Sequence, residues 1–202
     1  KQGEVLKGFD KDFQYEMAGL AGAEFEVYAA EDIYTADHQV DADGQRTLYF
    51  AKDALVATIT TDETGVAKLT DLPLGKYYVK EIATDEHYVL NGKKYLVNFE
   101  YMGQEVTTVT VDCGEFKNAL KRGKISGKKV DENEKSLENA LFGLFAVDTA
   151  EFTADNAYMT AVSDENGHFE FDKIPYGEYI VREIEAPTGY ILSDESYPVT
   201  IS

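Results

Sequence analysis

Four charged residues stand where predicted strands should place apolar side chains. Lys7 and Lys129 lie near the start of two similar segments, and Glu81 and Glu183 lie within a strand-like stretch of each. Side chains alternate across a strand, so all four share the face that holds apolar neighbours. Burial disfavours charge, and a buried Lys beside a buried Glu therefore favours the uncharged form of each group. An uncharged amine is a nucleophile.

The same residue types recur because the chain contains a repeat. Thr61–Gly65 recurs as Ser163–Gly167, and Leu72–Ile82 recurs as Ile174–Ile184, both at an offset of 102 residues. Self-similarity of this kind indicates a fold built from repeated units. The duplicated Lys and Glu belong to two copies of one unit.

The two copies differ in length. Leu20–Phe25 matches Leu137–Phe142 at an offset of 117 residues, so the first copy carries an extra 15 residues in the polar stretch near 31–54. We predict two domains, at residues 1–121 and 122–202, and align Gly3–Asp10 with Gly123–Asp131. The second copy is expected to lack its last strand.

The segments that contain these residues have the pattern of short β-strands. Asp-Glu-x-Gly supplies a turn in each copy, with glycine at a position that requires positive φ, and Pro73 and Pro175 precede the strand that holds the Glu. Further strands near 96–101 and 106–111 close the first copy. Short strands without a long helical period predict an all-β protein of two tandem antiparallel β-sandwiches.

Composition excludes several classes of function. The chain has 202 residues, 44% of them hydrophobic, which is enough for a packed core. Its net charge of −19 repels nucleic acid and anionic lipid, and no apolar run is long enough to cross a bilayer. Cys113 is the single cysteine, so no disulfide forms within the chain, and the histidines lack metal-ligand spacing. We expect no metal and no cofactor.

The ordered motifs resemble a known family. Leu-Ala-Gly-Ala-Glu-Phe, then Asp-Glu-x-Gly, then Leu-Pro-x-Gly-x-Tyr-x-Val-x-Glu-Ile are similar to the B-type repeat domains of Gram-positive surface adhesins and sortase-assembled pilins. These domains are called Cna-B-like or SpaA-like, and their fold is described as prealbumin-like or reverse immunoglobulin-like. The similarity covers both copies and so nearly the whole chain.

The resemblance implies an intramolecular isopeptide bond. In the family, a Lys on the first strand joins an Asn on the last strand, with help from the Glu of a Tyr-x-x-x-Glu box. Here Tyr77 and Glu81 match the box, Lys7 matches the lysine and Asn118 matches the acceptor. Lys11 is a weaker candidate for the lysine, because the spacing after Lys7 differs by one residue from that in the second copy.

The second copy matches the same motif only in part. Glu183 lies in its Tyr-x-x-x-Glu box and Lys129 is its lysine, but no Asn follows its final predicted strand within the sequence. We therefore expect Lys129 and Glu183 to remain unlinked and to form an ion pair or a shared-proton pair.

The implied function is structural. The family resemblance predicts a stalk or backbone module at the cell-wall-anchored surface of a Gram-positive bacterium, with neighbouring domains, pilin subunits and sortase as partners. The crosslinking reaction occurs once, so the protein is not an enzyme. A link from Lys7 to Asn118 closes a loop of about 111 residues, worth on the order of 4–5 kcal/mol in the chain-entropy treatment of crosslinks.

Two other functions stay open. An adhesive module would bind a host glycan or matrix protein, and the insertion around Asp32–Ala54 is the best place for such a ligand. Asp41–Gly44 within it resembles the start of a calcium loop, but Lys52 stands where the bidentate Glu is required, which favours a turn. A hydrolase is the less favoured alternative, because the sequence has no Gly-x-Ser-x-Gly motif.

Overall fold

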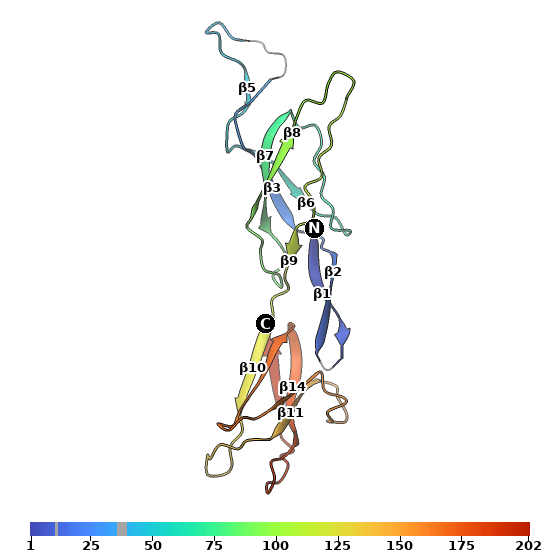
Figure 1. Ribbon diagram of the computed structural model, residues 1–202, viewed down its shortest axis with the longest axis vertical. Helices are drawn as coiled ribbons and strands as arrows, with labels where there is room; N and C mark the ends of the chain where they lie inside the picture. The colour runs from blue at the N-terminus through green and yellow to red at the C-terminus, as the bar shows by residue number, and fades with distance from the viewer. Residues whose placement is uncertain (11, 36–39) are drawn as a thin grey trace. The chain divides into compact units, whose positions relative to one another are not determined.

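A computed structural model describes residues 1–10, 12–35 and 40–202, and in this part of the chain the regular structure is all β (Figure 1). Contacts divide the chain into two compact units. Unit 1 holds Lys1–Glu4 and Met17–Ala119, and unit 2 holds Val5–Glu16 and Leu120–Ser202. The break at 119–120 lies close to the predicted boundary. The assignment of Val5–Glu16 to unit 2 has no counterpart in the sequence prediction.

Unit 1 is built around a four-stranded antiparallel sheet in the order β6-β3-β7-β8. Its strands are β3 (Glu24–Ala29), β6 (Leu55–Thr60), β7 (Gly75–Ala83) and β8 (Lys94–Phe99). A second sheet has the order β2-β1-β9, with β1 (Gln2–Phe9), β2 (Phe13–Gly19) and β9 (Lys117–Asn118). Only the first residues of β1 and the last residues of β2 belong to unit 1. β1 and β9 run parallel, with Gly3 opposite Asn118. The opening and closing strands of unit 1 therefore lie side by side.

Unit 2 repeats the central sheet of unit 1. The order β12-β11-β14-β15 is made by β11 (Leu141–Ala146), β12 (Met159–Val162), β14 (Gly177–Glu185) and β15 (Ser196–Ile201). A two-stranded sheet joins β10 (Gly123–Lys128) to β13 (His168–Ile174). The two antiparallel sandwiches confirm the predicted fold class.

Each sandwich has its own aromatic and aliphatic core, built from alternate residues of the central strands. In unit 1 the buried cluster comprises Ala23, Phe25, Val27, Ala29, Ile33, Tyr77, Val79, Val97 and Phe116. In unit 2 it comprises Phe13, Ala140, Phe142, Leu144, Phe169, Phe171, Ile174, Tyr179 and Val181. Burial of such side chains is the main favourable term for a chain that has no disulfide.

The predicted turn glycines adopt the expected backbone. Gly65 and Gly167 have φ values of 79° and 78°, a region that favours glycine. In each turn the preceding aspartate, Asp62 or Asp164, accepts hydrogen bonds from backbone N–H groups of the turn. The predicted strand at 106–111 is wrong, because this segment is irregular and the closing strand is β9 instead.

The length difference between the copies has two sources. The insertion near 31–54 contains a short hairpin of β4 (Ile33–Tyr34) and β5 (Leu48–Phe50). Asp41 Oδ1 there accepts hydrogen bonds from the N–H groups of Asp43 and Gln45, the arrangement of a turn. The β1–β2 hairpin is a second addition, and the alignment of Gly3–Asp10 with Gly123–Asp131 is wrong for that reason.

Candidate functional site

Glu81 lies at the centre of unit 1. Along β7, Tyr77, Val79 and Glu81 alternate onto the inner face, and the Glu81 side chain is fully buried. β7 is hydrogen-bonded to β3 on one side and β8 on the other, so the strand cannot turn this carboxylate outward without breaking both ladders. The sequence prediction of an inward-facing Glu is confirmed for Glu81, and likewise for Glu183, which is 2% exposed.

A lysine meets this carboxylate, but it is Lys1. Lys1 Nζ lies 2.7 Å from Glu81 Oε1, and both side chains are 0% exposed. The ion contact is close, yet Nζ is not aligned for a regular hydrogen bond. Desolvation lowers the pKa of the Lys1 amine, while its interactions with Glu81 act in the opposite direction. The net shift of the Lys1 pKa is downward, toward the neutral form of the amine.

Asn118 reaches the same carboxylate oxygen from β9. Its Nδ2 donates a hydrogen bond of 2.9 Å to Glu81 Oε1, and the residue is 2% exposed. Its Oδ1 is buried without a hydrogen-bond partner. Lys1 and Asn118 therefore converge on one oxygen of Glu81, in a site from which water is excluded.

Neighbouring groups fix the orientation of Glu81 and the position of Asn118. The N–H of Asn91 donates a 3.0 Å hydrogen bond to Glu81 Oε2, which leaves Oε1 directed at Lys1 and Asn118. Two residues before Asn118, the ring of Phe116 packs against Phe25 and Tyr95, with centroid distances of 5.1 and 4.0 Å. This packing anchors the short strand β9 and so positions the amide.

The prediction that Lys7 faces Glu81 is wrong. Its side chain is 64% exposed and lies 3.5 Å from Glu16 on β2. Lys1 and Lys7 are an even number of residues apart on one extended segment, so period-two alternation admits either of them. Lys11, the weaker candidate, lies outside the described residues.

Backbone pairing identifies Lys1 as the counterpart of Lys129. Leu20 N–H donates to the Lys1 carbonyl, and Leu137 N–H donates to the Lys129 carbonyl. Leu20 and Leu137 were already aligned by the repeat. The β1–β2 hairpin lies between Lys1 and Leu20, and the segment between Lys129 and Leu137 has no hairpin of that length. This difference in spacing hid the equivalence of the two lysines in the sequence.

The corresponding site in unit 2 contains two of the three groups. Lys129 Nζ lies 2.9 Å from Glu183 Oε2, so the predicted contact between these two residues is present. The N–H of Ser193 donates to the same Glu183 oxygen at 3.0 Å, as Asn91 does to Glu81. No asparagine side chain of the described residues is hydrogen-bonded to Glu183.

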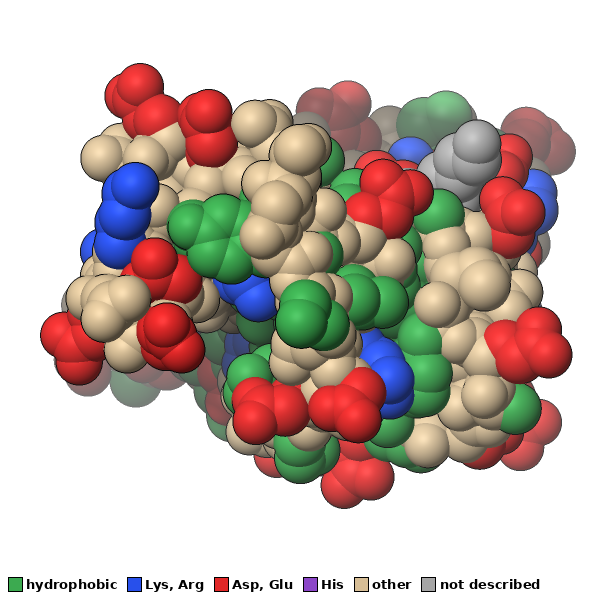
Figure 2. Space-filling view, turned by 90° about the horizontal axis from the view of Figure 1, so that it is seen from below, with side chains coloured by type: hydrophobic (Ala, Val, Ile, Leu, Met, Phe, Trp, Pro, Cys, Tyr) green, Lys and Arg blue, Asp and Glu red, His purple; other side chains and the backbone are tan. Residues whose placement is uncertain are grey.

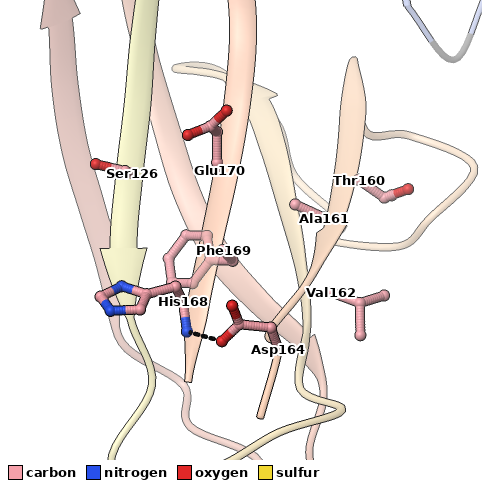
Figure 3. A pocket seen from close by; sticks show the side chains of 8 residues that line it. All are labelled: Ser126, Thr160, Ala161, Val162, Asp164, His168, Phe169 and Glu170. Carbon is pink, nitrogen blue, oxygen red and sulfur yellow. Dashed lines mark hydrogen bonds between the residues drawn. The ribbon is translucent and has the colours of Figure 1, made fainter. Parts of the chain in front are cut away.

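Unit 2 also has a surface hollow beside β12 and β13 (Figure 3). It is lined by Ser126, Thr160, Ala161, Val162, Asp164, His168, Phe169 and Glu170. The acidic groups of the hollow already have partners, since Asp164 closes the turn and Glu170 accepts a hydrogen bond from Lys124 Nζ. Because both acidic groups are already used within the fold, the hollow does not indicate a particular reaction or ligand.

Surface charge agrees with the composition. Acidic side chains are spread over the face shown in Figure 2, with fewer basic ones among them. Within the described part of the chain, no three His, Cys, Asp or Glu residues cluster as metal ligands would. No helix there is long and apolar enough to span a bilayer.

The two sandwiches, each with an inward-facing Glu, belong to the class of prealbumin-like domains. The family model of the SpaA prealbumin-like fold domain matches residues 9–113 and 123–202, and the chain belongs to this family. No curated protein is significantly similar to the chain.

Three solved structures that match the chain differ in how closely they resemble it. The Bacillus anthracis TIE protein has 27% identity and a TM-score of 0.58 over 92% of this chain and 29% of its own. A Streptococcal ancillary pilin has 24% identity and a TM-score of 0.37, over 100% of this chain and 58% of its own. BcpA, the major pilin subunit of Bacillus cereus, has 15% identity and a TM-score of 0.36, over 91% of each chain. The chain thus spans under a third of the TIE protein and just over half of the ancillary pilin.

Proposed function

We propose that this chain is a stalk module of a Gram-positive surface pilin or adhesin, stabilised by an intramolecular amide bond between Lys1 and Asn118. The convergence of Lys1 Nζ and Asn118 Nδ2 on the buried Glu81 Oε1 is the observation that supports it most. The family and the expected partners, neighbouring domains and pilin subunits, agree with such a role. Sortase attachment and a cell-wall location are further parts of the proposal.

The chemistry follows from the three side chains. Transfer of a proton from Lys1 to Glu81 leaves a neutral amine, which attacks Cγ of Asn118. Glu81, now protonated, stabilises the developing oxyanion and then passes a proton to the leaving nitrogen. A bond forms between Nζ and Cγ, the bond from Cγ to Nδ2 breaks, and ammonia departs.

The fold itself accelerates the proposed reaction between Lys1 and Asn118. Holding an amine and an amide together replaces a bimolecular encounter, and effective molarities of oriented groups reach about 10⁵–10⁸ M. Exclusion of water strengthens each electrostatic interaction at the site. Because the groups are consumed, the reaction occurs once per molecule and the protein is its own product.

The mechanical consequence explains why a stalk would use this bond. β1 and β9 run parallel, and their pairing joins the two ends of unit 1. Tension applied to those ends passes through the amide instead of shearing backbone hydrogen bonds. A chain without a disulfide gains a covalent tie in this way.

Intact mass of the folded protein tests the proposal. Wild type should be lighter than its sequence mass by one ammonia, whereas Asn118→Ala and Glu81→Gln should have their full sequence masses. Asn98→Ala changes an exposed amide on β8 and is the matched control, and it should still lose ammonia. A wild-type mass equal to the sequence value contradicts the crosslink.

An adhesive role is the second candidate, supported by the insertion around Asp32–Ala54. Tyr34 is 38% exposed, Leu48 is 47% exposed and Tyr49 is 56% exposed, and the Arg46 guanidinium lies 4.9 Å from the Tyr34 ring centre. Exposed aromatic rings with a cation suit a glycan or a matrix protein. Binding to a glycan array should be lost when the insertion is replaced by a short turn, and unchanged binding contradicts this role. Turnover of ester substrates would instead favour a hydrolase.

A further inference from the structure

The sequence contains two Asn-Gly pairs, Asn91–Gly92 and Asn166–Gly167. In such a pair the main-chain nitrogen of the glycine can attack the side-chain amide of the asparagine, because the two groups belong to adjacent residues and no Cβ on the glycine hinders their approach. The attack closes a cyclic imide, which water then opens. The structure places the two pairs in different surroundings, and these surroundings distinguish their reactivity.

The glycine nitrogens of the two pairs differ in their contacts. The Gly167 N–H donates a 2.8 Å hydrogen bond to the Asp164 carbonyl, and a Cβ on Gly167 would lie 2.4 Å from the Lys129 carbonyl oxygen. In the described part of the chain, no hydrogen bond has the Gly92 N–H as its donor, and a Cβ on Gly92 would meet no atom beyond its chain neighbours within 4 Å. The Gly92 nitrogen can therefore turn toward the preceding side chain without breaking a hydrogen bond.

The Asn91 side chain is held by groups that suit this attack. Its Oδ1 accepts a 3.2 Å hydrogen bond from the Lys93 N–H, and a donor at this oxygen stabilises the negative charge that develops when the amide carbon is attacked. Its Nδ2, the nitrogen that leaves, donates to the Tyr95 hydroxyl at 3.0 Å and to the Lys117 carbonyl at 3.4 Å. Asn91 is partly buried and Gly92 is exposed, so water reaches the pair.

The repeat shows that the fold does not require an asparagine at this position. Ser193 of unit 2 stands at the position of Asn91, at the same offset of 102 residues. The N–H of each residue donates a 3.0 Å hydrogen bond to the buried glutamate of its unit. Ser193 Oγ accepts from the Glu195 N–H, as Asn91 Oδ1 accepts from the Lys93 N–H. A serine makes both contacts, so the side-chain amide in unit 1 is not needed for either of them.

We propose that Asn91 is a modification site, at which the folded protein spontaneously converts the asparagine to isoaspartate and aspartate. Gly92 is the attacking residue, and water is the only other reactant. Asn166 converts more slowly in the folded protein, because its glycine nitrogen is bound within the turn. This inference does not depend on the amide bond proposed between Lys1 and Asn118, since neither residue takes part.

The reaction consumes one water and releases one ammonia. The Gly92 nitrogen bonds to Cγ of Asn91, the bond from Cγ to Nδ2 breaks, and Nδ2 leaves as ammonia with the hydrogen of the Gly92 N–H. Water then adds to one of the two imide carbonyls. Opening at Cγ gives aspartate, whereas opening at the main-chain carbon gives isoaspartate, whose backbone runs through the side chain. No group is oxidised or reduced.

The test follows two peptides of the 202-residue protein before and after incubation in warm, mildly alkaline buffer. Cleavage after lysine releases residues 81–93, which contain Asn91, and residues 136–173, which contain Asn166. Peptide 81–93 should acquire two new forms, each heavier by the difference between a water and an ammonia, and isoaspartyl methyltransferase should label one of them. Asn166 should convert several-fold more slowly. Fresh protein digested in parallel corrects for conversion during digestion.

Two substitutions test the role of each residue of the pair. Asn91→Ser should remove both new forms and leave the protein folded, since Ser193 makes the same contacts in unit 2. Gly92→Ala should slow the conversion of Asn91 several-fold, because the methyl group hinders the attacking nitrogen, and the open space around Gly92 accommodates it. The same digests report a link between Lys1 and Asn118 in other peptides, so the outcome at Asn91 is separate from that of the proposed function.

Three outcomes would overturn the inference. In the first, folded protein keeps the mass of peptide 81–93 during an incubation that converts a synthetic peptide of the same sequence, which would mean that the fold protects Asn91. In the second, Asn91 and Asn166 convert at equal rates, so that the hydrogen bond of the glycine nitrogen has no effect. In the third, Gly92→Ala leaves the rate unchanged, which would indicate direct hydrolysis of the side-chain amide.

Discussion

Asn118 Nδ2 donates a hydrogen bond to Glu81 Oε1, and this bond joins residues that lie on β9 and β7. The nitrogen held by the carboxylate is the one that would leave as ammonia. An acid placed against a leaving group assists its departure by protonating it. The carbonyl oxygen of the same amide is buried and has no hydrogen-bond partner.

Arginine substitutions distinguish the two candidate lysines. Lys1→Arg should abolish the loss of ammonia, because a guanidinium stays protonated and is not a nucleophile. Lys7→Arg should leave the loss of ammonia complete, since Lys7 lies on an exposed part of β1 beside Glu16. Intact mass measures both. A mass defect that disappears with Lys7→Arg and persists with Lys1→Arg would return the assignment to Lys7.

Removing the acceptor should reduce stability. In Asn118→Ala, a loop of about 117 residues is no longer closed in the unfolded chain, which costs about 4–5 kcal/mol in the chain-entropy treatment. Denaturant unfolding of unit 1 measures the difference in free energy of unfolding from wild type. Asn98→Ala should change this free energy by less than about 0.5 kcal/mol, as surface substitutions do. Equal stability of Asn118→Ala and wild type would contradict a crosslink at this site.

The tyrosine of each Tyr-x-x-x-Glu box predicts an alkaline loss of stability. Tyr179 donates to the Pro175 carbonyl at 2.8 Å, and burial raises its pKa to about 12. An unfolded tyrosine has a pKa of about 10, so between these values the unfolded state releases a proton that the native state keeps. The free energy of unfolding should therefore fall as pH rises from about 10 to about 12.

Substitution isolates the contribution of Tyr179. In Tyr179→Phe, the decline of unfolding free energy over the alkaline range should be shallower than in wild type, because one group with a raised pKa is gone. Tyr101 is 67% exposed, and Tyr101→Phe should leave the slope unchanged. Denaturant unfolding at a series of pH values provides the slopes. Identical slopes for Tyr179→Phe and wild type would exclude Tyr179 as a source.

The turn glycine beside the lysine is predicted to be intolerant of a side chain. A Cβ on Gly167 would lie 2.4 Å from the Lys129 carbonyl oxygen, at a φ of 78°. Gly167→Ala therefore adds a backbone clash to the conformational cost of about 1–2 kcal/mol for a left-handed residue. Gly44 has a similar φ of 75° but open space around it, so Gly44→Ala pays only the conformational cost.

Thermal unfolding compares the two glycine variants. Gly167→Ala should lower the Tm of unit 2 more than Gly44→Ala lowers the Tm of unit 1. It should also displace Lys129 from Glu183, because the N–H of Lys129 donates to the Gly167 carbonyl. Similar small shifts for both variants would show that the turn can move away from the lysine strand.

The sequence alone predicts the all-β fold and the inward position of Glu81. The inward position of Glu81 follows from the alternation of Tyr77, Val79 and Glu81, because period two is a direct consequence of strand geometry. The all-β fold follows from short strand-like segments separated by turns, without a long helical period. Asn118 was assigned from family resemblance, and the structure places its side chain against Glu81.

The lysine could not be predicted, and the reason is physical. Period-two alternation reports which face a residue lies on, but it does not report where along the strand a distant partner crosses. The position of Lys1 opposite Glu81 depends on long-range pairing of β1 with β9. The β1–β2 hairpin also shifted the local alignment of the two copies. The paired backbone contacts of Leu20 and Leu137 remove the ambiguity, and these exist only in three dimensions.

The parallel pairing of Gly3 with Asn118 also determines when the proposed amide bond could form. These residues are separated by almost all of unit 1, and contacts of such sequence distance are the slowest to form in a folding chain. During synthesis the amine and its carboxylate precede the acceptor strand, so ligation must wait until the unit has closed around them. Under the proposed reaction, the covalent bond is then a permanent record that one molecule reached its native topology. The fraction of molecules that keep the full sequence mass would then measure how many never reached the native topology.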